Sequence, residues 1–190
     1  MSKDIMEINL LSGALGAEIK DINLRDNSTE NFNKINKLLL EHKVIFFREQ
    51  NITPEEHIKL ASCFGTIETH AYVKARKGYP EILRIIKEPD EKNQWGEGWH
   101  SDVSYNPKPT KAVVLRSVKI PPIGGDTVFS NMELAWETLD SEIKNIVKNK
   151  KAIHSSLGAS FFVKNYNAME SNGNYDEYSN EHPILRIHPE

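Results

Sequence analysis

The sequence contains very little cysteine: Cys63 is the only one among 190 residues. One thiol can form neither an intrachain disulfide nor a thiolate metal cluster, and a chain without disulfides fits a reducing compartment. The residues around it, LASCFG, are typical of a helix interior. We therefore interpret Cys63 as a buried, small apolar side chain and not as a reactive thiol.

Long hydrophobic runs and an excess of one charge are also missing. No stretch approaches the roughly 20 apolar residues that span a bilayer, and the first residues, MSKDIMEINL, lack the continuous apolar segment of a secretory signal. Lys and Arg number 24 against 27 Asp and Glu, so the net charge is only -3. This balance argues against a nucleic-acid or anionic-membrane surface. The sequence therefore predicts a cytoplasmic protein that binds neither nucleic acid nor membranes.

Internal repeats and low-complexity tracts are absent as well, and the length suits one core, so we expect a single domain over residues 1–190. Near the start, NFNKINKLLLEH (residues 31–42) places four apolar side chains at helical spacing, which predicts a helix with one buried stripe. The β-branched and aromatic segment KVIFF (residues 43–47) predicts a strand directly after it.

The clearest local pattern is a helix with both ends marked, TPEEHIKLASCFG. Thr53 can cap its first turn, Pro54 suits the first helical position, and Glu56 completes a capping box. Gly65 favours a left-handed stop at the other end.

The remaining chain alternates β-branched segments with helical patterns. A capping box at Ser130 and Glu133 predicts the start of one helix. We expect strands at 81–88, 111–120 and 182–190, helices at 131–139 and 141–150, and an exposed loop at 164–181.

The segment GWHSDVSY contains a His-x-Asp pair, His100 and Asp102. Such pairs arise by chance, and a second His-x-acid pair occurs at His188 and Glu190. In a strand, residues i and i+2 point to the same face, so His100 and Asp102 could reach one ion. With a second histidine they would form the two-histidine, one-carboxylate triad that binds Fe(II) and leaves coordination positions open. The alternative is two polar residues on an exposed strand, and the pair alone does not decide between them.

Four segments together resemble the taurine dioxygenase family (TauD/TfdA) of Fe(II)- and 2-oxoglutarate-dependent dioxygenases. They are LSGALGAEI, HKVIFFREQNITPEEHIKLASCFG, GWHSDVSYNPKPTKAVVLRSVKIPPIGGDTVFSNMELAWETL and HPILRIHPE, in the family's order and approximate spacing. The resemblance covers residues 8–154 and 182–190. Its specific part is the aromatic-His-x-Asp followed about two dozen residues later by Gly-Gly-Asp-Thr.

The resemblance implies an α+β, mainly β fold: a jelly roll (double-stranded β-helix) with outer helices. It makes His100 and Asp102 the first two iron ligands, and Thr127 the hydroxyl that binds the distal carboxylate of 2-oxoglutarate. The same Gly-Gly-Asp-Thr segment, taken alone, predicts a tight turn with Gly124 and Gly125 at positive φ.

Substrate contacts are implied at two further positions. His70 matches a histidine that touches the anionic head group in taurine dioxygenase, and Tyr72 lies near the family's substrate-contacting tyrosine in a shifted register. Trp95, Glu97 and Trp99 precede the His-x-Asp pair where the family lines its pocket, and we assign Trp99 to packing.

The third histidine ligand and the arginine that anchors the cosubstrate lie, in the family, beyond the last matching segment. We therefore expect both beyond Glu190, and a jelly roll that is C-terminally incomplete. The other candidate histidines and arginines match positions that are not ligands: His154, His182, His188, Arg116 and Arg186.

The implied activity is hydroxylation of a small organic acid, taurine- or sulfonate-like or related, by Fe(II), 2-oxoglutarate and O2. 2-Oxoglutarate is decarboxylated to succinate and CO2 in the same reaction. The partner is then a small-molecule substrate, and a homo-oligomer is compatible with the sequence. The alternative is a non-catalytic jelly roll that binds metal weakly or binds a partner. We expect residues 1–190 alone to bind Fe(II) weakly, to be inactive and to self-associate.

Overall fold

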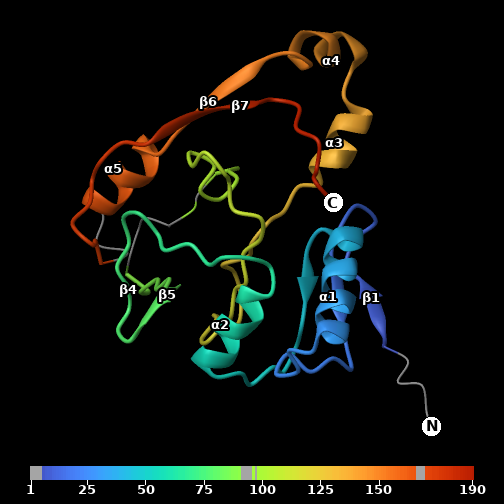
Figure 1. Ribbon diagram of the computed structural model, residues 1–190, viewed down its shortest axis with the longest axis vertical. Helices are drawn as coiled ribbons and strands as arrows, with labels where there is room; N and C mark the ends of the chain where they lie inside the picture. Colours follow the sequence, from blue (N-terminus) through green and yellow to red (C-terminus); the bar gives the residue numbers. More distant parts are fainter. Residues whose placement is uncertain (1–5, 91–95, 97, 166–169) are drawn as a thin grey trace. The chain divides into compact units, whose positions relative to one another are not determined.

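The computed structural model describes residues 6–90, 96, 98–165 and 170–190 (Figure 1). Within it the chain forms two compact units, which are described separately. The first unit comprises Met1–Cys63, Val114–Ile146 and His188–Glu190, and the second comprises Phe64–Val113 and Val147–Ile187. That residues 1–190 act as one domain stays a prediction.

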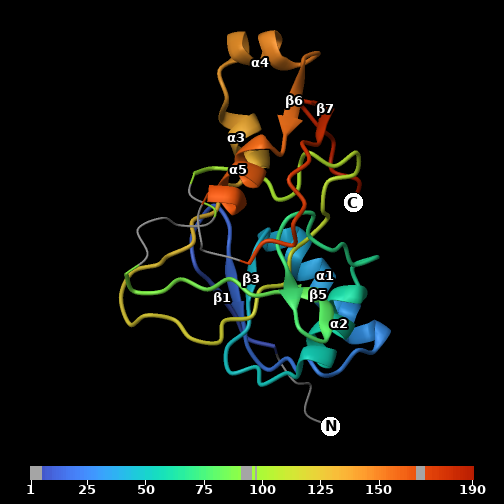
Figure 2. The ribbon, with the colours of Figure 1, turned by 90° about the vertical axis from the view of Figure 1, so that its left-hand side faces the viewer.

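A three-stranded sheet and a helix form the core of the first unit. The strands are β1 (Ile8–Leu10), β2 (Ala17–Ile19) and β3 (Ile45–Phe46), in the order β1-β2-β3. β1 and β3 are labelled in Figure 2. β1 pairs with β2 antiparallel, and β2 pairs with β3 parallel. The two parallel strands are joined through helix α1 (Thr29–His42), which supplies the crossover that a parallel pair requires.

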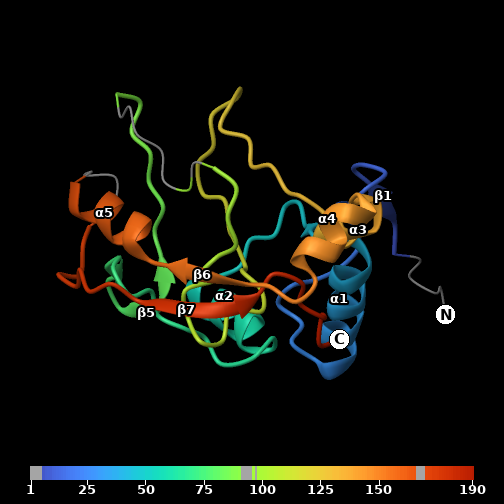
Figure 3. The same cartoon turned by 90° about the horizontal axis from the view of Figure 1, so that it is seen from above.

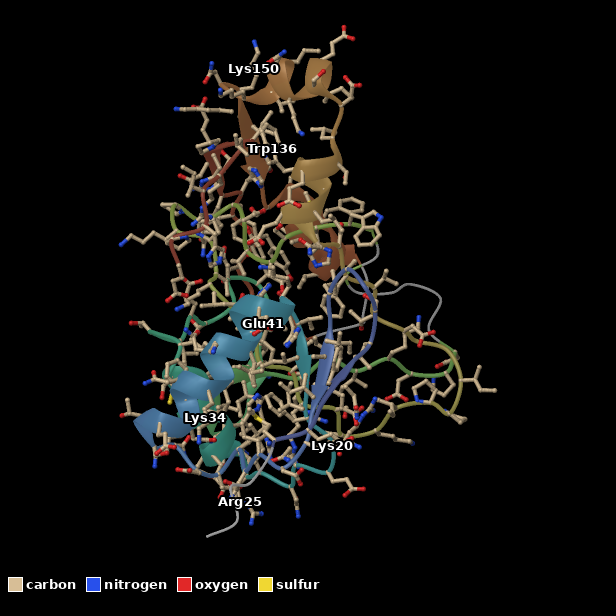
Figure 4. All side chains as sticks on the ribbon, turned by 90° about the vertical axis from the view of Figure 1, so that its right-hand side faces the viewer. Lys20, Arg25, Lys34, Glu41, Trp136 and Lys150 are labelled. Atoms are coloured by element: carbon tan, nitrogen blue, oxygen red, sulfur yellow. The ribbon has the colours of Figure 1, made fainter. Side chains whose placement is uncertain are left out.

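Helix α1 confirms the helix predicted at 31–42 and begins two residues earlier. The Ser28 side chain caps it by accepting the Asn31 N–H at 3.2 Å. Ile35 and Leu38 are buried, as the apolar stripe predicted. The opposite face is polar and carries an exposed ion pair between Lys34 and Glu30 at 2.8 Å; Lys34 and Glu41 are labelled along α1 in Figure 4.

Helix α2 (Pro54–Ser62) has the predicted start. Thr53 Oγ1 accepts the Glu56 N–H at 3.2 Å, and Glu56 accepts the Thr53 N–H at 2.7 Å, so the capping box is formed. The predicted stop at Gly65 is wrong in detail. The helix ends at Ser62, its C-cap Cys63 keeps a right-handed conformation, and Gly65 has φ 143° in the segment that follows.

Two short helices follow in the second half of the chain, α3 (Met132–Thr138) and α4 (Ser141–Val147). The predicted cap at Ser130 is wrong: Asn131 is the N-cap, and its Oδ1 accepts the N–H groups of Glu133 and Leu134 at 3.1 Å each. Asn and Ser are equally good capping residues, so the sequence did not separate these neighbours.

The second unit contains two small antiparallel sheets and one helix. β4 (Ala75–Arg76) pairs with β5 (Tyr79–Leu83), and β6 (Lys151–Ser155) pairs with β7 (Ser179–Pro183), which runs beside it in Figure 3. Helix α5 (Leu157–Asn165) follows β6 and was not predicted.

The core of the second unit is built from four buried residues of distant segments. Tyr72 is 0% exposed and packs with Val73, Tyr105 and Val163. The Tyr72 hydroxyl donates to the Asp176 carbonyl at 2.7 Å and is hydrogen-bonded to a buried serine at the start of α5, Ser156.

Several predicted strands differ from the structure. The described residues at 111–120 form no strand, although the segment is rich in β-branched residues. Strand preference depends on a neighbouring strand and a covered face, and Leu115 and Val118 are exposed instead. β7 covers only the start of the strand predicted at 182–190, and the strand predicted at 81–88 is displaced to β5.

The described residues form one three-stranded and two two-stranded sheets, so they do not show the two large facing sheets expected of a jelly roll. Helices are present outside these sheets, and the fold of the described residues is mixed α and β. None of the helices in the described part of the chain combines the length and the apolar character needed to cross a bilayer.

Candidate metal and substrate site

His100 and Asp102 lie close together in the second unit, but not on a strand. His100 is in an irregular segment, and Asp102 begins a turn in which Val103 has φ 49°. The prediction that both residues lie on a strand is therefore wrong. The side chains meet nevertheless, with His100 Nε2 3.2 Å from Asp102 Oδ1, and each is 52% exposed.

The ring of His100 is oriented by a backbone carbonyl. Its Nδ1 lies 2.9 Å from the carbonyl oxygen of Gly98. A carbonyl oxygen only accepts, so Nδ1 carries the proton of this hydrogen bond. The other ring nitrogen, Nε2, faces the Asp102 carboxylate, which is likewise an acceptor.

The chemistry of this donor pair fits a divalent metal ion. A lone pair on Nε2 and one on a carboxylate oxygen repel each other unless a proton or a cation lies between them. Two ligand atoms about 2.1 Å from one ion and at a right angle to each other are about 3.0 Å apart. The observed 3.2 Å between His100 Nε2 and Asp102 Oδ1 is close to that separation.

A third ligand is not present among the residues that the structure describes, where no group of three His, Cys, Asp or Glu side chains could hold a metal. Two of the histidines that we did not expect to be ligands pack against each other: the rings of His154 and His182 are 5.2 Å apart. His182 Nε2 is 3.0 Å from the Asn106 carbonyl, and His188 Nδ1 accepts the Glu190 N–H at 3.2 Å.

Thr127 lies in the first unit, in an exposed segment that precedes α3 in sequence. The glycines before it have φ 81° at Gly124 and 75° at Gly125, which confirms the positive φ predicted for both. The role of the Thr127 hydroxyl stays a prediction.

His70 is half-buried in the second unit and has a defined tautomer. Its Nδ1 accepts the N–H groups of Tyr72 and Val73 at 3.1 Å each, so Nε2 carries the proton of the neutral ring. Burial lowers the pKa of His70, and the negative charge of Asp102 opposes this effect more weakly. His70 is therefore a neutral imidazole near pH 7 with a donor at Nε2.

Tyr72 is placed differently from the prediction. It is completely buried, and its hydroxyl is bonded to Ser156 and to the Asp176 carbonyl. This placement argues against a direct contact between the Tyr72 side chain and a substrate. Trp99 is 74% exposed and so does not pack as expected. Trp95 and Glu97, the other predicted pocket residues, lie outside the described residues.

Two residues near the pair were not singled out from the sequence, Gly98 and Tyr105. Tyr105 is 7% exposed, and within the described part of the chain its buried hydroxyl has no hydrogen-bond partner. Burial raises the pKa of Tyr105 to about 12. Both residues stand in the quoted segment GWHSDVSY, where a glycine two residues before the histidine was the available signal.

Comparisons with known proteins agree on one family. The sequence pattern of the family described as "Taurine catabolism dioxygenase TauD, TfdA family" matches residues 7–190. An alkylsulfatase of Acinetobacter baylyi is 32% identical, with 97% of this chain and 60% of the relative covered. An alpha-ketoglutarate-dependent sulfate ester dioxygenase of Pseudomonas putida is 29% identical, with 97% and 63% covered.

A solved structure shares the fold. The crystal structure of a taurine dioxygenase from Burkholderia xenovorans superposes with a TM-score of 0.73 at 29% identity. The match covers 97% of this chain and 60% of that one. The chain therefore spans about 60% of the length of such relatives.

Proposed function

The chain belongs to the taurine catabolism dioxygenase TauD, TfdA family, and from this membership we propose that it acts as an Fe(II)- and 2-oxoglutarate-dependent dioxygenase on a small organic acid. Bound Fe(II) and 2-oxoglutarate would supply the oxidative chemistry, in which O2 hydroxylates the substrate while 2-oxoglutarate is decarboxylated to succinate and CO2. The fold proposed for the whole protein is the jelly roll with outer helices.

The observation that carries this proposal is the pair of His100 Nε2 and Asp102 Oδ1 at 3.2 Å. An imidazole nitrogen and a carboxylate oxygen are the ligand types of an open non-haem iron site. We assign metal binding to His100 and Asp102. Their half-exposed side chains leave room for further ligands of the same ion.

Two other residues would bind the organic reactants. The Thr127 hydroxyl would donate to the distal carboxylate of 2-oxoglutarate, and its exposed position leaves it accessible. His70 would donate from Nε2 to an anionic oxygen of the substrate, because its Nδ1 is already occupied as an acceptor. Tyr72 would then act through its backbone N–H, which orients the His70 ring.

The proposed substrate class is small organic acids that carry a sulfate, sulfonate or carboxylate group. The names of the relatives support this class, since they include a sulfate ester dioxygenase and a phenoxypropionate dioxygenase. A neutral histidine donor such as His70 suits an anionic oxygen of any of these groups.

The second candidate is a protein of the same fold that binds metal weakly, or binds a partner, without catalysis. It is supported by the finding that the described residues provide only two metal ligands in one place. Turnover by the full gene product would exclude this candidate.

The test is succinate formation by the full gene product with Fe(II), 2-oxoglutarate and a panel of alkyl sulfates, sulfonates and phenoxy acids. His100→Ala and Asp102→Ala should each abolish succinate formation with little change in circular dichroism. Thr127→Val should weaken the apparent affinity for 2-oxoglutarate about tenfold or more, since one hydrogen bond to a charged group is lost.

The matched control is His154→Ala, which removes a histidine of the same unit that lies in a different pair. It should keep its succinate formation. Retained turnover in His100→Ala or Asp102→Ala would overturn the ligand assignment, and an unchanged 2-oxoglutarate KM in Thr127→Val would remove Thr127 from the site.

A further inference from the structure

We propose that Asn172 is a positioning residue for His70, because it binds the carbonyl ends of the two peptide groups whose N–H ends bind the His70 ring. The inference rests on the proposed role of His70 in substrate binding and names a residue that prepares His70 for it. Asn172 lies within the exposed loop expected at 164–181, about a hundred residues along the chain from His70. Both residues belong to the second unit.

Two consecutive peptide groups direct their N–H ends to one nitrogen of the His70 ring. The N–H groups of Tyr72 and Val73 each donate to His70 Nδ1 at 3.1 Å. Both partners of Nδ1 are donors, so Nδ1 is the acceptor and the neutral ring keeps its proton at Nε2. The direction of these two N–H groups therefore sets the orientation in which His70 offers a donor to a substrate.

Asn172 binds the opposite end of each of these peptide groups. Its Nδ2 donates to the Ala71 carbonyl at 2.8 Å, and its backbone N–H donates to the Tyr72 carbonyl at 2.9 Å. The Ala71 carbonyl shares a peptide group with the Tyr72 N–H, and the Tyr72 carbonyl shares the next one with the Val73 N–H. A trans peptide group is planar, with its C=O and N–H pointing in opposite directions. By fixing the two carbonyls, Asn172 therefore fixes the two N–H groups that hold the His70 ring.

The neighbours of Asn172 hold it in this position. Ser171, directly before it, forms an antiparallel bridge with Val73. The Asn172 Oδ1 accepts the Asn174 N–H at 2.9 Å, which leaves Nδ2 of the same amide to reach the Ala71 carbonyl. A hydrogen bond at the carbonyl of a peptide group also polarises its N–H, so these contacts strengthen the donors that reach His70.

The test is Asn172→Asp in the full gene product. Aspartate has nearly the same shape and keeps an oxygen for the Asn174 N–H, but it cannot donate to the Ala71 carbonyl and its charge repels that oxygen. The peptide group between Ala71 and Tyr72 should then turn, and the Tyr72 N–H should move away from His70 Nδ1.

The readout is the tautomer of His70 in protein without metal, cosubstrate or substrate. Long-range nitrogen–proton NMR of 15N-histidine-labelled protein, recorded at a pH where the ring is neutral, distinguishes Nδ1–H from Nε2–H, and His70→Asn identifies the signals. In the unsubstituted protein we expect Nε2–H to predominate. In Asn172→Asp the share of Nδ1–H should rise several-fold.

Asn174→Asp is the matched control in the same loop. The Asn174 Nδ2 donates to the Tyr178 hydroxyl at 3.0 Å, and its Oδ1 accepts the Asp176 N–H at 2.9 Å. This variant adds the same charge, removes the same kind of donor and keeps the same kind of acceptor, but the lost contact lies within the loop. It should leave the His70 tautomer unchanged. An equal share of Nδ1–H in the two variants would overturn the proposal, because a role in loop structure alone predicts no difference.

The consequence for the substrate is measured in the succinate assay, with the member of the panel that is turned over fastest. The KM for this substrate should rise several-fold in Asn172→Asp relative to Asn174→Asp, because the His70 donor is turned away from the anionic group. The KM for 2-oxoglutarate should be the same in both variants. Equal substrate KM values in the two variants would contradict a positioning role of Asn172.

The unsubstituted protein already provides a test if Asn172→Asp folds poorly. A predominance of Nδ1–H at His70 in it would overturn the proposal without any variant. Because the NMR measurement uses no metal, cosubstrate or substrate, its outcome is separate from that of the dioxygenase assay. A protein that shows the expected tautomer change without any turnover would contradict the proposed function and support the role of Asn172.

Discussion

Two tyrosines of one buried cluster differ in the hydrogen bonds that their hydroxyl groups form. Tyr72 and Tyr105 have ring centres 6.2 Å apart in the core of the second unit. The Tyr72 hydroxyl reaches the Asp176 carbonyl and Ser156, whereas the buried Tyr105 hydroxyl finds no partner in the described part of the chain. A buried polar group without a partner lowers stability by about 1–3 kcal/mol.

This difference predicts opposite effects of the same substitution. Tyr105→Phe should raise the free energy of unfolding by about 1–2 kcal/mol, because it removes an unpaired buried hydroxyl. Tyr72→Phe should lower it by about 1–3 kcal/mol, because it leaves the Asp176 carbonyl unpaired. Urea unfolding at pH 8 measures both. Equal destabilisation by the two variants would show that Tyr105 has a partner.

The burial of the Tyr105 hydroxyl should also be visible in how the stability of the chain depends on pH. Burial raises its pKa to about 12, above the ordinary value of 10. The unfolded chain therefore releases this proton first, and stability is lost as the pH rises from about 10 through 12. Tyr105→Phe should lose less stability than the unsubstituted chain between pH 8 and pH 10.5.

His70 should make the fold sensitive to mild acid. Burial lowers its pKa below the ordinary 6.5, so the folded chain binds this proton less readily than the unfolded chain. The stability from neutral His70 is complete above pH 6.5 and is lost as the pH falls below it. His70→Asn keeps an acceptor for the two backbone N–H groups but does not titrate. Its urea midpoint should fall less between pH 7.5 and 5.5 than that of the unsubstituted chain, whereas the exposed control His188→Asn should behave as the unsubstituted chain does.

At the scale of elements, the helix ends are set by hydrogen bonds that can be removed one at a time. The Asn131 side chain caps α3 through Oδ1 and donates from Nδ2 to the Ala14 carbonyl at 2.7 Å. Both contacts lie within the first unit. The Asn131 side chain therefore stabilises the start of α3 and links it by a hydrogen bond to the loop between β1 and β2.

A series at the start of α3 separates these contacts. Asn131→Ala should lower the free energy of unfolding by about 1–2 kcal/mol, because it removes the cap and the bond to Ala14. Asn131→Asp keeps a capping oxygen and should cost less. Ser130→Ala, at the position that the sequence indicated, should change stability by no more than about 0.5 kcal/mol. A larger loss in Ser130→Ala than in Asn131→Ala would place the cap where the sequence put it.

What could be predicted from the sequence was local. The capping box of Thr53 and Glu56 and the positive φ of Gly124 and Gly125 follow from neighbouring residues, and the structure confirms them. The strand expected at 111–120 depended on partner strands far along the chain, which residue preferences do not specify. This is why the helices were better predicted than the sheets.

The candidate site divides in the same way. The residue types and spacing of His100 and Asp102 were enough to propose a metal pair, but the strand assumed for them was wrong. The contribution of Gly98 depends on a positive φ and a carbonyl direction, and the burial of Tyr72 depends on packing with Val163. A short sequence motif specifies neither the carbonyl direction at Gly98 nor the burial of Tyr72.

At the scale of the whole molecule, many large apolar side chains of the described residues are exposed. Several of them lie in the segment 115–128 of the first unit. Its most exposed apolar side chains are Leu115 at 68%, Val118 at 88%, Ile120 at 70%, Ile123 at 89% and Val128 at 69%.

Apolar surface on this scale favours association, because it is removed from water when two molecules meet. We predict that the 190-residue chain self-associates in a concentration-dependent way and binds the dye ANS. Val118→Glu combined with Ile123→Glu should shift the association to concentrations several-fold higher, as measured by sedimentation velocity. Ser117→Glu combined with Ser130→Glu is the control, since it adds the same charge at exposed positions without removing apolar surface. A larger effect of the control pair would mean that charge, and not the apolar segment 115–128, limits association, and a chain that stays monomeric at high concentration would show that this segment is covered in solution.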